Sequence, residues 1–127
     1  MSAPADRPRM SRLRLALLRL RDEAVRLLEV FLAREPLLRG SVYELRRKCG
    51  RPSCHCAEGE PHATWVLATS GPRGRRLRTL PPSRLPEVRR RAERSRRFRR
   101  ARARLVQVHR QILAFVDQLE EARRKEG

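Results

Sequence analysis

Aromatic residues are scarce in this 127-residue chain, in which three Phe, one Trp and one Tyr make up 4% of the sequence. Any core must therefore be built from Leu, Val and Ala, and so charged a chain has too little apolar material to enclose a large active-site cavity. Long apolar runs are missing too, and no stretch approaches the ~18 uncharged residues that a transmembrane helix needs. The length predicts one domain.

A secretory signal is also missing. The apolar run over residues 15–18 is interrupted by Arg19 and Arg21, and two acidic residues follow directly. Only three cysteines are present, and they lie within eight residues of one another, which is unlike a disulfide framework. We therefore expect a chain that stays in the reducing cytoplasm and does not associate with membranes.

Acidic residues are few relative to basic ones, since 14 Asp and Glu stand against 32 Lys and Arg, a formal net charge of +18. The excess is concentrated in residues 73–104, where fifteen Arg and two Glu give a net charge of +13. Arginine has a planar guanidinium that can bind a phosphate through two hydrogen bonds. Positive charge of this density favours a polyanionic partner.

Two long helices are predicted, one near each end of the chain. Residues 1–10 contain two Pro and predict a flexible tail, which precedes a helix over 11–35 that a proline ends. A second helix is predicted over 84–125, with Pro86 in its first turn, where its missing N–H costs nothing. Each helix carries an apolar stripe at alternating three- and four-residue spacing, which is typical of a coiled coil. The first stripe consists of Leu13, Leu17, Leu20, Ala24, Leu27 and Phe31, and the second of Phe98, Ala101, Leu105, Val108, Ile112, Phe115 and Leu119.

The predicted fold is α+β, with two helices that are joined by a compact middle segment and packed as an antiparallel coiled coil. The same stripes could instead pair between subunits. The middle segment, residues 38–82, predicts a small three-stranded antiparallel meander with strands over 40–45, 64–69 and 75–80. Residues 11–127 are then expected to form a single domain. Further apolar residues widen both stripes beyond a two-stranded seam, which favours a homodimer. These residues are Leu18, Leu28, Val106, Leu113 and Val116.

The cysteines and one histidine form a compact motif, in which Cys49, Cys54, Cys56 and His62 are spaced C-x4-C-x-C-x5-H. Three thiolates and an imidazole at this spacing can close a tetrahedral Cys3His zinc site. Gly and Pro residues around them supply the tight turns that a short metal loop requires. A small sheet with one Trp has little core of its own, so we expect zinc to contribute directly to its folding.

Other interpretations of the cysteine cluster stay open at this point. A disulfide is disfavoured in a reducing compartment, a catalytic Cys–His pair does not need two further cysteines, and buried cysteines would not gather in a polar loop. His55 competes with His62 as the fourth ligand, although its place between two ligating cysteines is expected to point it away from the metal. Four protein ligands leave no open position for water, and the sequence contains no catalytic acid pair, triad or phosphate-binding loop, so we do not expect an enzyme.

Four short segments carry a resemblance to a known family. They are residues 39–44 (Arg-Gly-Ser-Val-Tyr-Glu), 48–57 (Lys-Cys-Gly-Arg-Pro-Ser-Cys-His-Cys-Ala), 59–62 (Gly-Glu-Pro-His) and 96–98 (Arg-Arg-Phe). These segments resemble a family of small, uncharacterised bacterial and archaeal proteins that share a Cys-Gly-Lys-Pro-x-Cys-x-Cys-Ala block, a His-Gly-Pro-Tyr block, a hairpin and an Arg-Arg-Phe element. Such proteins are often encoded near transposases, so the resemblance implies a metal site and a mobile-element setting. The likeness covers residues 38–116, and Ala-Thr-Trp stands at 63–65 where the family has Gly-Pro-Tyr.

The second predicted helix contains eleven Arg between positions 84 and 104. Like charges one turn apart oppose helix formation, and a bound polyanion would relieve that repulsion. Nucleic acid is the expected partner, and duplex DNA is favoured over structured RNA, with contacts to phosphates rather than to bases. The strand over 75–80 is expected to join the helix in one continuous positive face. The candidate binding residues are Arg73, Arg75, Arg76, Arg78, Arg89, Arg90, Arg94, Arg96, Arg97, Arg100 and Arg104.

Two other interpretations of the arginine-rich helix are considered. The chain can instead be an oligomeric adaptor whose arginines dock an acidic protein partner such as a transposase. The arginines can also form a solvated face that Asp22, Glu23 and Glu29 of the first helix partly neutralise. Three acids cannot balance eleven Arg, so an accessory or regulatory nucleic-acid-binding protein is the expected function.

Overall fold

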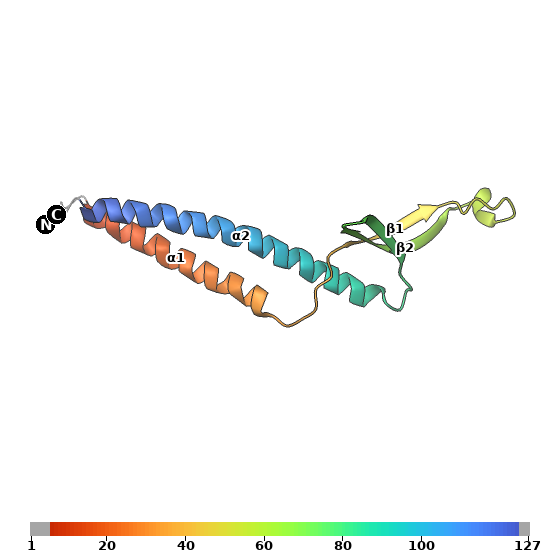
Figure 1. The fold of residues 1–127 in the computed structure, drawn as a ribbon, viewed down its shortest axis with the longest axis horizontal. Helices are drawn as coiled ribbons and strands as arrows, with labels where there is room; N and C mark the ends of the chain where they lie inside the picture. The colour runs from red at the N-terminus through yellow and green to blue at the C-terminus, as the bar shows by residue number, and fades with distance from the viewer. Residues whose placement is uncertain (1–5, 125–127) are drawn as a thin grey trace. The chain divides into compact units, whose positions relative to one another are not determined.

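The computed structural model describes residues 6–124, in which two helices flank three strands (Figure 1). The elements are α1 (Asp6–Leu32), β1 (Ser41–Arg47), the 3-10 turn η1 (His55–Ala57), β2 (His62–Gly71), β3 (Gly74–Thr79) and α2 (Leu85–Arg124). This order confirms the predicted α+β fold. The chain divides into two compact units, one formed by the described residues up to Arg34 and from Phe98 onward, the other by Glu35–Arg97. A single domain over 11–127 stays a prediction.

Helix α1 begins five residues earlier than the sequence predicted. It starts at Asp6, so the prediction of a flexible tail is wrong over residues 6–10, and over residues 1–5 it lies outside the described residues. Pro8 lies in the first turn, where a helix needs no N–H. Met10 is only 8% exposed and extends the predicted apolar stripe by one step. Burial of Met10 therefore favours a helix that begins before residue 11, the start that the sequence predicted.

The same helix also ends earlier than predicted, at Leu32 rather than at residue 35. Pro36 explains this end. In a continued helix it would have no N–H to donate to the Leu32 carbonyl, and its ring would collide with that same carbonyl. Helix α2 runs to Arg124, and the predicted last residue, 125, lies outside the described residues. Over residues 6–124 no helix combines the length and the apolar character that crossing a membrane requires.

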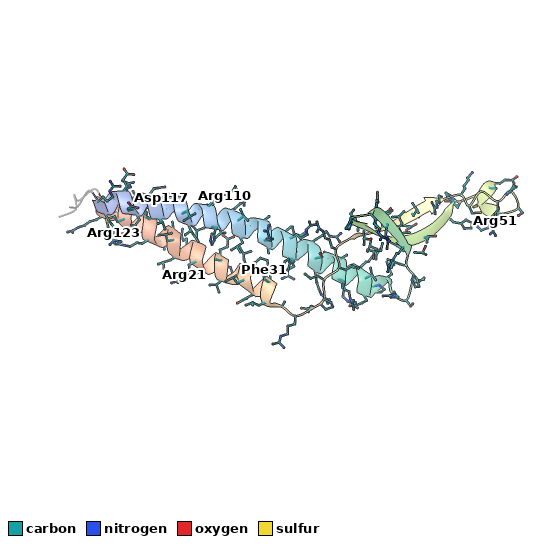
Figure 2. All side chains as sticks on the ribbon, in the orientation of Figure 1. Arg21, Phe31, Arg51, Arg110, Asp117 and Arg123 are labelled. Carbon is teal, nitrogen blue, oxygen red and sulfur yellow. The ribbon has the colours of Figure 1, made fainter. Side chains whose placement is uncertain are left out.

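In the first unit, α1 and the C-terminal part of α2 lie side by side in opposite directions and form a helical hairpin (Figure 1). Phe31 points from α1 toward α2, and its ring meets that of Phe98 edge-on with the centroids 4.9 Å apart (Figure 2). Every residue of the two predicted stripes is buried or half-buried, and Val108 is fully buried. The stripes therefore face the interior of the hairpin as predicted, whereas coiled-coil packing stays a prediction.

The second unit is a three-stranded antiparallel sheet in the order β1-β2-β3, with the first turns of α2 packed on one face. All three predicted strands are present, and β1 and β2 extend beyond their predicted ends. The core of this unit is built from Leu67, Leu80 and Val88, with Leu38, Val42, Trp65 and Leu85 packed around them.

The connection between α1 and β1 runs close against this unit. The Leu38 N–H donates a hydrogen bond of 3.2 Å to the carbonyl of Arg91 in α2. Gly40 then passes so near β2 that a Cβ atom there would lie 2.8 Å from the Ala68 carbonyl oxygen and 2.9 Å from Leu67 Cδ1. Only glycine fits at this position without a shift of the neighbouring strand.

Candidate metal centre and basic surface

Four side chains of the cysteine loop converge at one point. The ligand atoms of Cys49, Cys54, Cys56 and His62 all lie within 4.8 Å of one another. Cys49 Sγ is 3.4 Å from Cys56 Sγ, and Cys54 Sγ is 3.1 Å from His62 Nε2. A tetrahedral zinc ion with Zn–S bonds of about 2.3 Å places neighbouring sulfurs about 3.7 Å apart, so the four residues fit a metal ion of this kind. The predicted ligand set is confirmed as a group that can hold a metal.

Strand pairing brings the first and last ligands together. β1 ends at Arg47, whose partner on β2 is His62, and Cys49 follows two residues later. Gly50 then adopts a φ of +83°, in the left-handed region that glycine tolerates without steric cost, and turns the chain into the loop. The candidate metal centre therefore lies at the connection between β1 and β2.

The other two ligands lie at η1, in the loop that Arg51 marks in Figure 2. The Ala57 N–H donates to the Cys54 carbonyl at 3.0 Å, which forms the turn and leaves Cys56 fully buried inside it. The Cys49 N–H donates to Cys56 Sγ at 3.4 Å, and Lys48 Nζ donates to the Ala57 carbonyl at 3.2 Å. These contacts hold Cys49 and Cys56 close to each other within the loop.

His55 takes a different position from His62. It is exposed, and its Nδ1 lies 3.9 Å from Cys54 Sγ. Its ring stands edge-on to the His62 ring, with the centroids 5.3 Å apart. The structure therefore places His62 in the ligand group and leaves His55 outside it, as the sequence predicted.

The loop environment shifts the pKa values of two of its cysteines. The Arg51 backbone N–H, and then the Cys56 thiol, lower the pKa of Cys49 to about 7 by hydrogen bonding to its sulfur. The Cys49 N–H acts in the same direction on Cys56, but burial and the neighbouring thiols outweigh it and raise the pKa of Cys56. Cysteine binds metal as the thiolate. A pKa of about 7 brings Cys49 close to this form at neutral pH.

The arginines predicted to bind nucleic acid fall into two groups. Five contact a neighbouring side chain: Arg75 with Tyr43, Arg89 with Trp65, Arg90 with Glu87, Arg94 with Glu35 and Arg104 with Glu23. Within residues 6–124, the other six are exposed and form no ion pair: Arg73, Arg76, Arg78, Arg96, Arg97 and Arg100. About half of the predicted set is therefore available to an external anion.

Acidic residues neutralise only part of α2. The Glu87 carboxylate accepts hydrogen bonds from Arg91 at 2.9 Å and Arg90 at 2.6 Å, which lower its pKa to about 2. Of the first-helix acids considered from the sequence, Glu23 pairs with α2, whereas Asp22 pairs with its own neighbour in α1. Within residues 6–124, the acids engage Arg90, Arg91, Arg94 and Arg104 and leave Arg96, Arg97 and Arg100 without an ion pair.

Strand β3 presents its arginines on both faces of the sheet. Arg78 pairs with Leu67 and Arg76 lies two residues earlier, so both belong to the face on which α2 packs. Arg75 belongs to the other face, where it donates to the Tyr43 hydroxyl at 3.1 Å and its guanidinium lies 5.9 Å from the ring centroid. The strand therefore contributes two arginines, not three, to the face that it shares with the helix.

Trp65 carries a contact that sequence reasoning missed. It packs against the core of the sheet, and its ring centroid also lies 4.2 Å from the Arg89 guanidinium carbon. A guanidinium over an indole face is a favourable cation–π contact. No sequence pattern signals it, because the two residues are 24 positions apart and meet only through packing of α2 on the sheet.

The comparison with protein families identifies the chain. A family model described as Domain of unknown function (DUF6788) matches residues 15–90, which is more than half of the sequence, so the chain belongs to this family. The match includes the whole cysteine loop. No curated protein and no solved structure matches the chain.

Proposed function

We propose that this member of the DUF6788 family is a zinc-stabilised nucleic-acid-binding protein, an accessory or regulatory factor rather than an enzyme. It contacts the phosphates of duplex DNA, and the resemblance of its cysteine block favours the setting of a mobile element. The observation that carries the proposal is the group of exposed arginines without ion pairs in β3, its turn and α2.

Charge in the sheet unit supports a polyanionic ligand. Residues 35–97 contain fifteen Arg and one Lys against six Glu, a net charge of +10 in 63 residues. Arg96 and Arg97 are exposed on α2 in this unit, and Arg76 and Arg78 lie on the sheet face on which α2 packs. Arginine–phosphate contacts release condensed counterions from a duplex, and this release supplies most of non-specific binding.

The zinc ion in this proposal has a structural role. Cys49, Cys54, Cys56 and His62 would supply four protein ligands. Four protein ligands are the full set of a structural tetrahedral zinc site, which has no position for a reacting water. When bound, the metal would hold the connection between β1 and β2 and so fix the sheet that carries the β3 arginines. Binding of nucleic acid, not chemistry at the metal, is the activity that such a closed site supports.

Salt-dependent DNA binding tests the proposal. With about six phosphate contacts, the slope of log K against log salt is expected to be roughly −5 on duplex DNA. Replacing Arg96, Arg97 and Arg100 with Gln is expected to make the slope shallower by about three and to weaken binding to all sequences alike. The matched control replaces Arg12, Arg19 and Arg110, three exposed arginines outside the 73–104 stretch, and keeps the slope of the parent chain.

The adaptor function predicts a different outcome of the same experiment. An adaptor binds duplexes weakly even in ~50 mM salt, where phosphate contacts are strongest. Its Arg96, Arg97 and Arg100 substitutions abolish capture of one acidic protein and leave metal content intact. That result, or equal slopes for the two triple variants, contradicts nucleic-acid binding by this surface.

A further inference from the structure

We infer that the turn between β2 and β3 enters the minor groove of duplex DNA and gives the protein a preference for A·T base pairs. The inference rests on the proposed function and adds a groove and a base preference to it. The starting observation is a long segment without acidic residues, since residues 61–86 contain five Arg and no Asp or Glu. The whole β2–β3 hairpin lies within this acid-free segment.

The end of the hairpin is a two-stranded ribbon without a third strand. β1 begins at Ser41, whose partner on β2 is Ala68, so residues 69–71 pair with residues 74–76 of β3 alone. Three residue pairs at about 3.3 Å per residue extend the ribbon by roughly 10 Å. The minor groove is about 7.5 Å deep. The ribbon is therefore long enough for its turn to reach the base pairs at the floor of the groove.

The tip of this ribbon is narrow and exposed. Pro72 and Arg73 form the turn between Gly71 and Gly74, which pair with each other, and every residue over 70–76 is exposed. The two glycines leave the ribbon without side chains directly behind its turn. The major groove, about 12 Å wide, admits a whole two-stranded ribbon, whereas the minor groove, about 6 Å wide, requires a slimmer element. The glycine pair therefore favours the minor groove.

The fold itself explains only one of these two glycines. Gly74 has a φ of +97°, in the left-handed region, so the turn requires glycine there. Gly71 has no positive φ, and no atom lies within 4 Å of a Cβ built at that position. Glycine weakens the interior of a strand, and it is typical of sites where a ligand approaches the backbone closely. A ligand at the tip, rather than packing within the protein, accounts for Gly71.

Each face of the ribbon carries one arginine and one hydroxyl. Arg76 is the cross-strand partner of Thr69, and Arg75 is that of Ser70, so the two pairs lie on opposite faces. A minor groove has a phosphate backbone on either side, and guanidinium and hydroxyl groups both bind phosphates. Within residues 6–124, Arg76 forms no ion pair and Arg75 contacts only the neutral Tyr43 side chain. Each arginine therefore keeps its charge for one of the two backbones.

The two turn residues predict which base pairs are preferred. Arg73 is exposed and forms no ion pair in the part of the chain that the structure describes, residues 6–124. The minor groove of A·T tracts is narrow and strongly negative, which attracts inserted arginines, whereas G·C pairs place an amino group in it. Pro72 is exposed too, and proline is among the apolar residues that minor-groove proteins insert between base steps. We therefore expect tighter binding to A·T-rich duplexes.

Duplexes that differ in one groove only test the inference. Inosine·cytosine pairs present the major groove of G·C and, because inosine lacks the 2-amino group of guanine, the minor groove of A·T. Fluorescence anisotropy measures the affinity of the full chain for duplexes of ~20 bp, about two helical turns, whose central pairs are A·T, G·C or inosine·cytosine. The A·T and inosine·cytosine duplexes are expected to bind alike and about tenfold more tightly than the G·C duplex.

Gly71→Val tests the narrow tip without removing a charge. Valine favours strands and has free space at this position, so the variant is expected to equal or exceed the parent chain in Tm. Its affinity for the A·T and inosine·cytosine duplexes is expected to fall about tenfold, to that for the G·C duplex. Ala63→Val is the matched control, because it adds a valine at an exposed position near the other end of β2 and is expected to keep the preference.

Arg73→Gln tests the charge at the tip. This variant is expected to lose the A·T preference, since glutamine brings no positive charge into the negative groove. Arg12→Gln removes the same charge from an exposed position on α1 and is expected to retain the preference.

Three results would overturn the inference. They are equal affinity of the parent chain for all three duplexes, an inosine·cytosine duplex that binds like the G·C duplex, and a Gly71→Val or Arg73→Gln variant that keeps the A·T preference. All three leave salt-dependent phosphate binding, and with it the proposed function, intact. A parent chain that binds no duplex in ~50 mM salt contradicts the proposed function and this inference together.

Discussion

Glu23 of α1 and Arg104 of α2 form a two-point ion pair, with Oε2 2.5 Å from Nε and Oε1 2.7 Å from Nη2. Both side chains are partly shielded from water, and the pair lies between the two helices of the hairpin. Arg104 is the last arginine of the 84–104 stretch, and this contact engages it within the protein. It is therefore the weakest candidate in the predicted nucleic-acid-binding set.

We predict that this ion pair makes the hairpin sensitive to acid. The hydrogen bond from Arg104 lowers the pKa of Glu23 below its ordinary value of 4.5. The pair therefore stabilises the fold above that ordinary value, and the stabilisation is lost as the pH falls through the lowered pKa. Glu23→Gln is expected to reduce the Tm at pH 7, and the difference from the parent chain is expected to vanish at strongly acidic pH.

Glu29→Gln is the matched control for that measurement, because Glu29 is an exposed carboxylate on the same helix. It is expected to leave the Tm at pH 7 nearly unchanged. A Glu23→Gln variant whose Tm difference is the same at pH 7 and at pH 2 would show that the charge of Glu23 does not stabilise the hairpin.

Zinc stoichiometry provides a second prediction. Reduced protein purified without tags is expected to contain about one zinc per chain, and removal by a chelator is expected to reduce the strand signal in circular dichroism. His62→Ala is expected to lose the metal, whereas His55→Ala, which changes the exposed histidine outside the ligand group, retains it. Metal-free protein that is fully folded with three freely titrating thiols would contradict the zinc site.

The close approach at Gly40 yields a third prediction. A Cβ atom at this position meets backbone and side-chain atoms of β2 at under 3.0 Å, so Gly40→Ala forces the strands apart. The expected loss is on the order of 1–3 kcal/mol, as for other overpacked sites. Gly71→Ala is the control, since no atom lies within 4 Å of a Cβ there, and denaturant unfolding should separate the two variants clearly. Equal stabilities would exclude a tight contact at Gly40.

Features encoded by residues near one another in the sequence were predictable. The four residues that can hold a metal lie within 14 residues of sequence, and the chemistry of three thiols and an imidazole predicts them as a group. The inward stripes were equally readable, because helical spacing alone defines which side chains share a face. The N-terminal boundary of α1 was not, since Pro8 is compatible with both a tail and a first helical turn and only the burial of Met10 distinguishes them.

Features that depend on contacts distant in sequence were not predictable. Arg104 and Glu23 are 81 residues apart, and which of Asp22, Glu23 and Glu29 would meet an arginine depends on the register between the helices. Strand alternation separates Arg75 from Arg76 and Arg78, but which of these arginines share a face with the helix depends on which face of the sheet α2 covers. The sequence therefore predicts that this part of the chain is rich in arginine, and the structure determines which of these arginines are available to an external anion.

His62 is at once the first residue of β2, the partner of Arg47 in the sheet and a member of the ligand group. A metal held by this residue is thermodynamically linked to strand pairing, since a ligand that binds only the folded form stabilises it by RT ln(1 + [L]/Kd). Above the dissociation constant, each tenfold rise in free zinc would add about 1.4 kcal/mol to the stability of the sheet. The amount of chain able to present the β3 arginines would then follow the free zinc concentration, even with the amount of protein held constant.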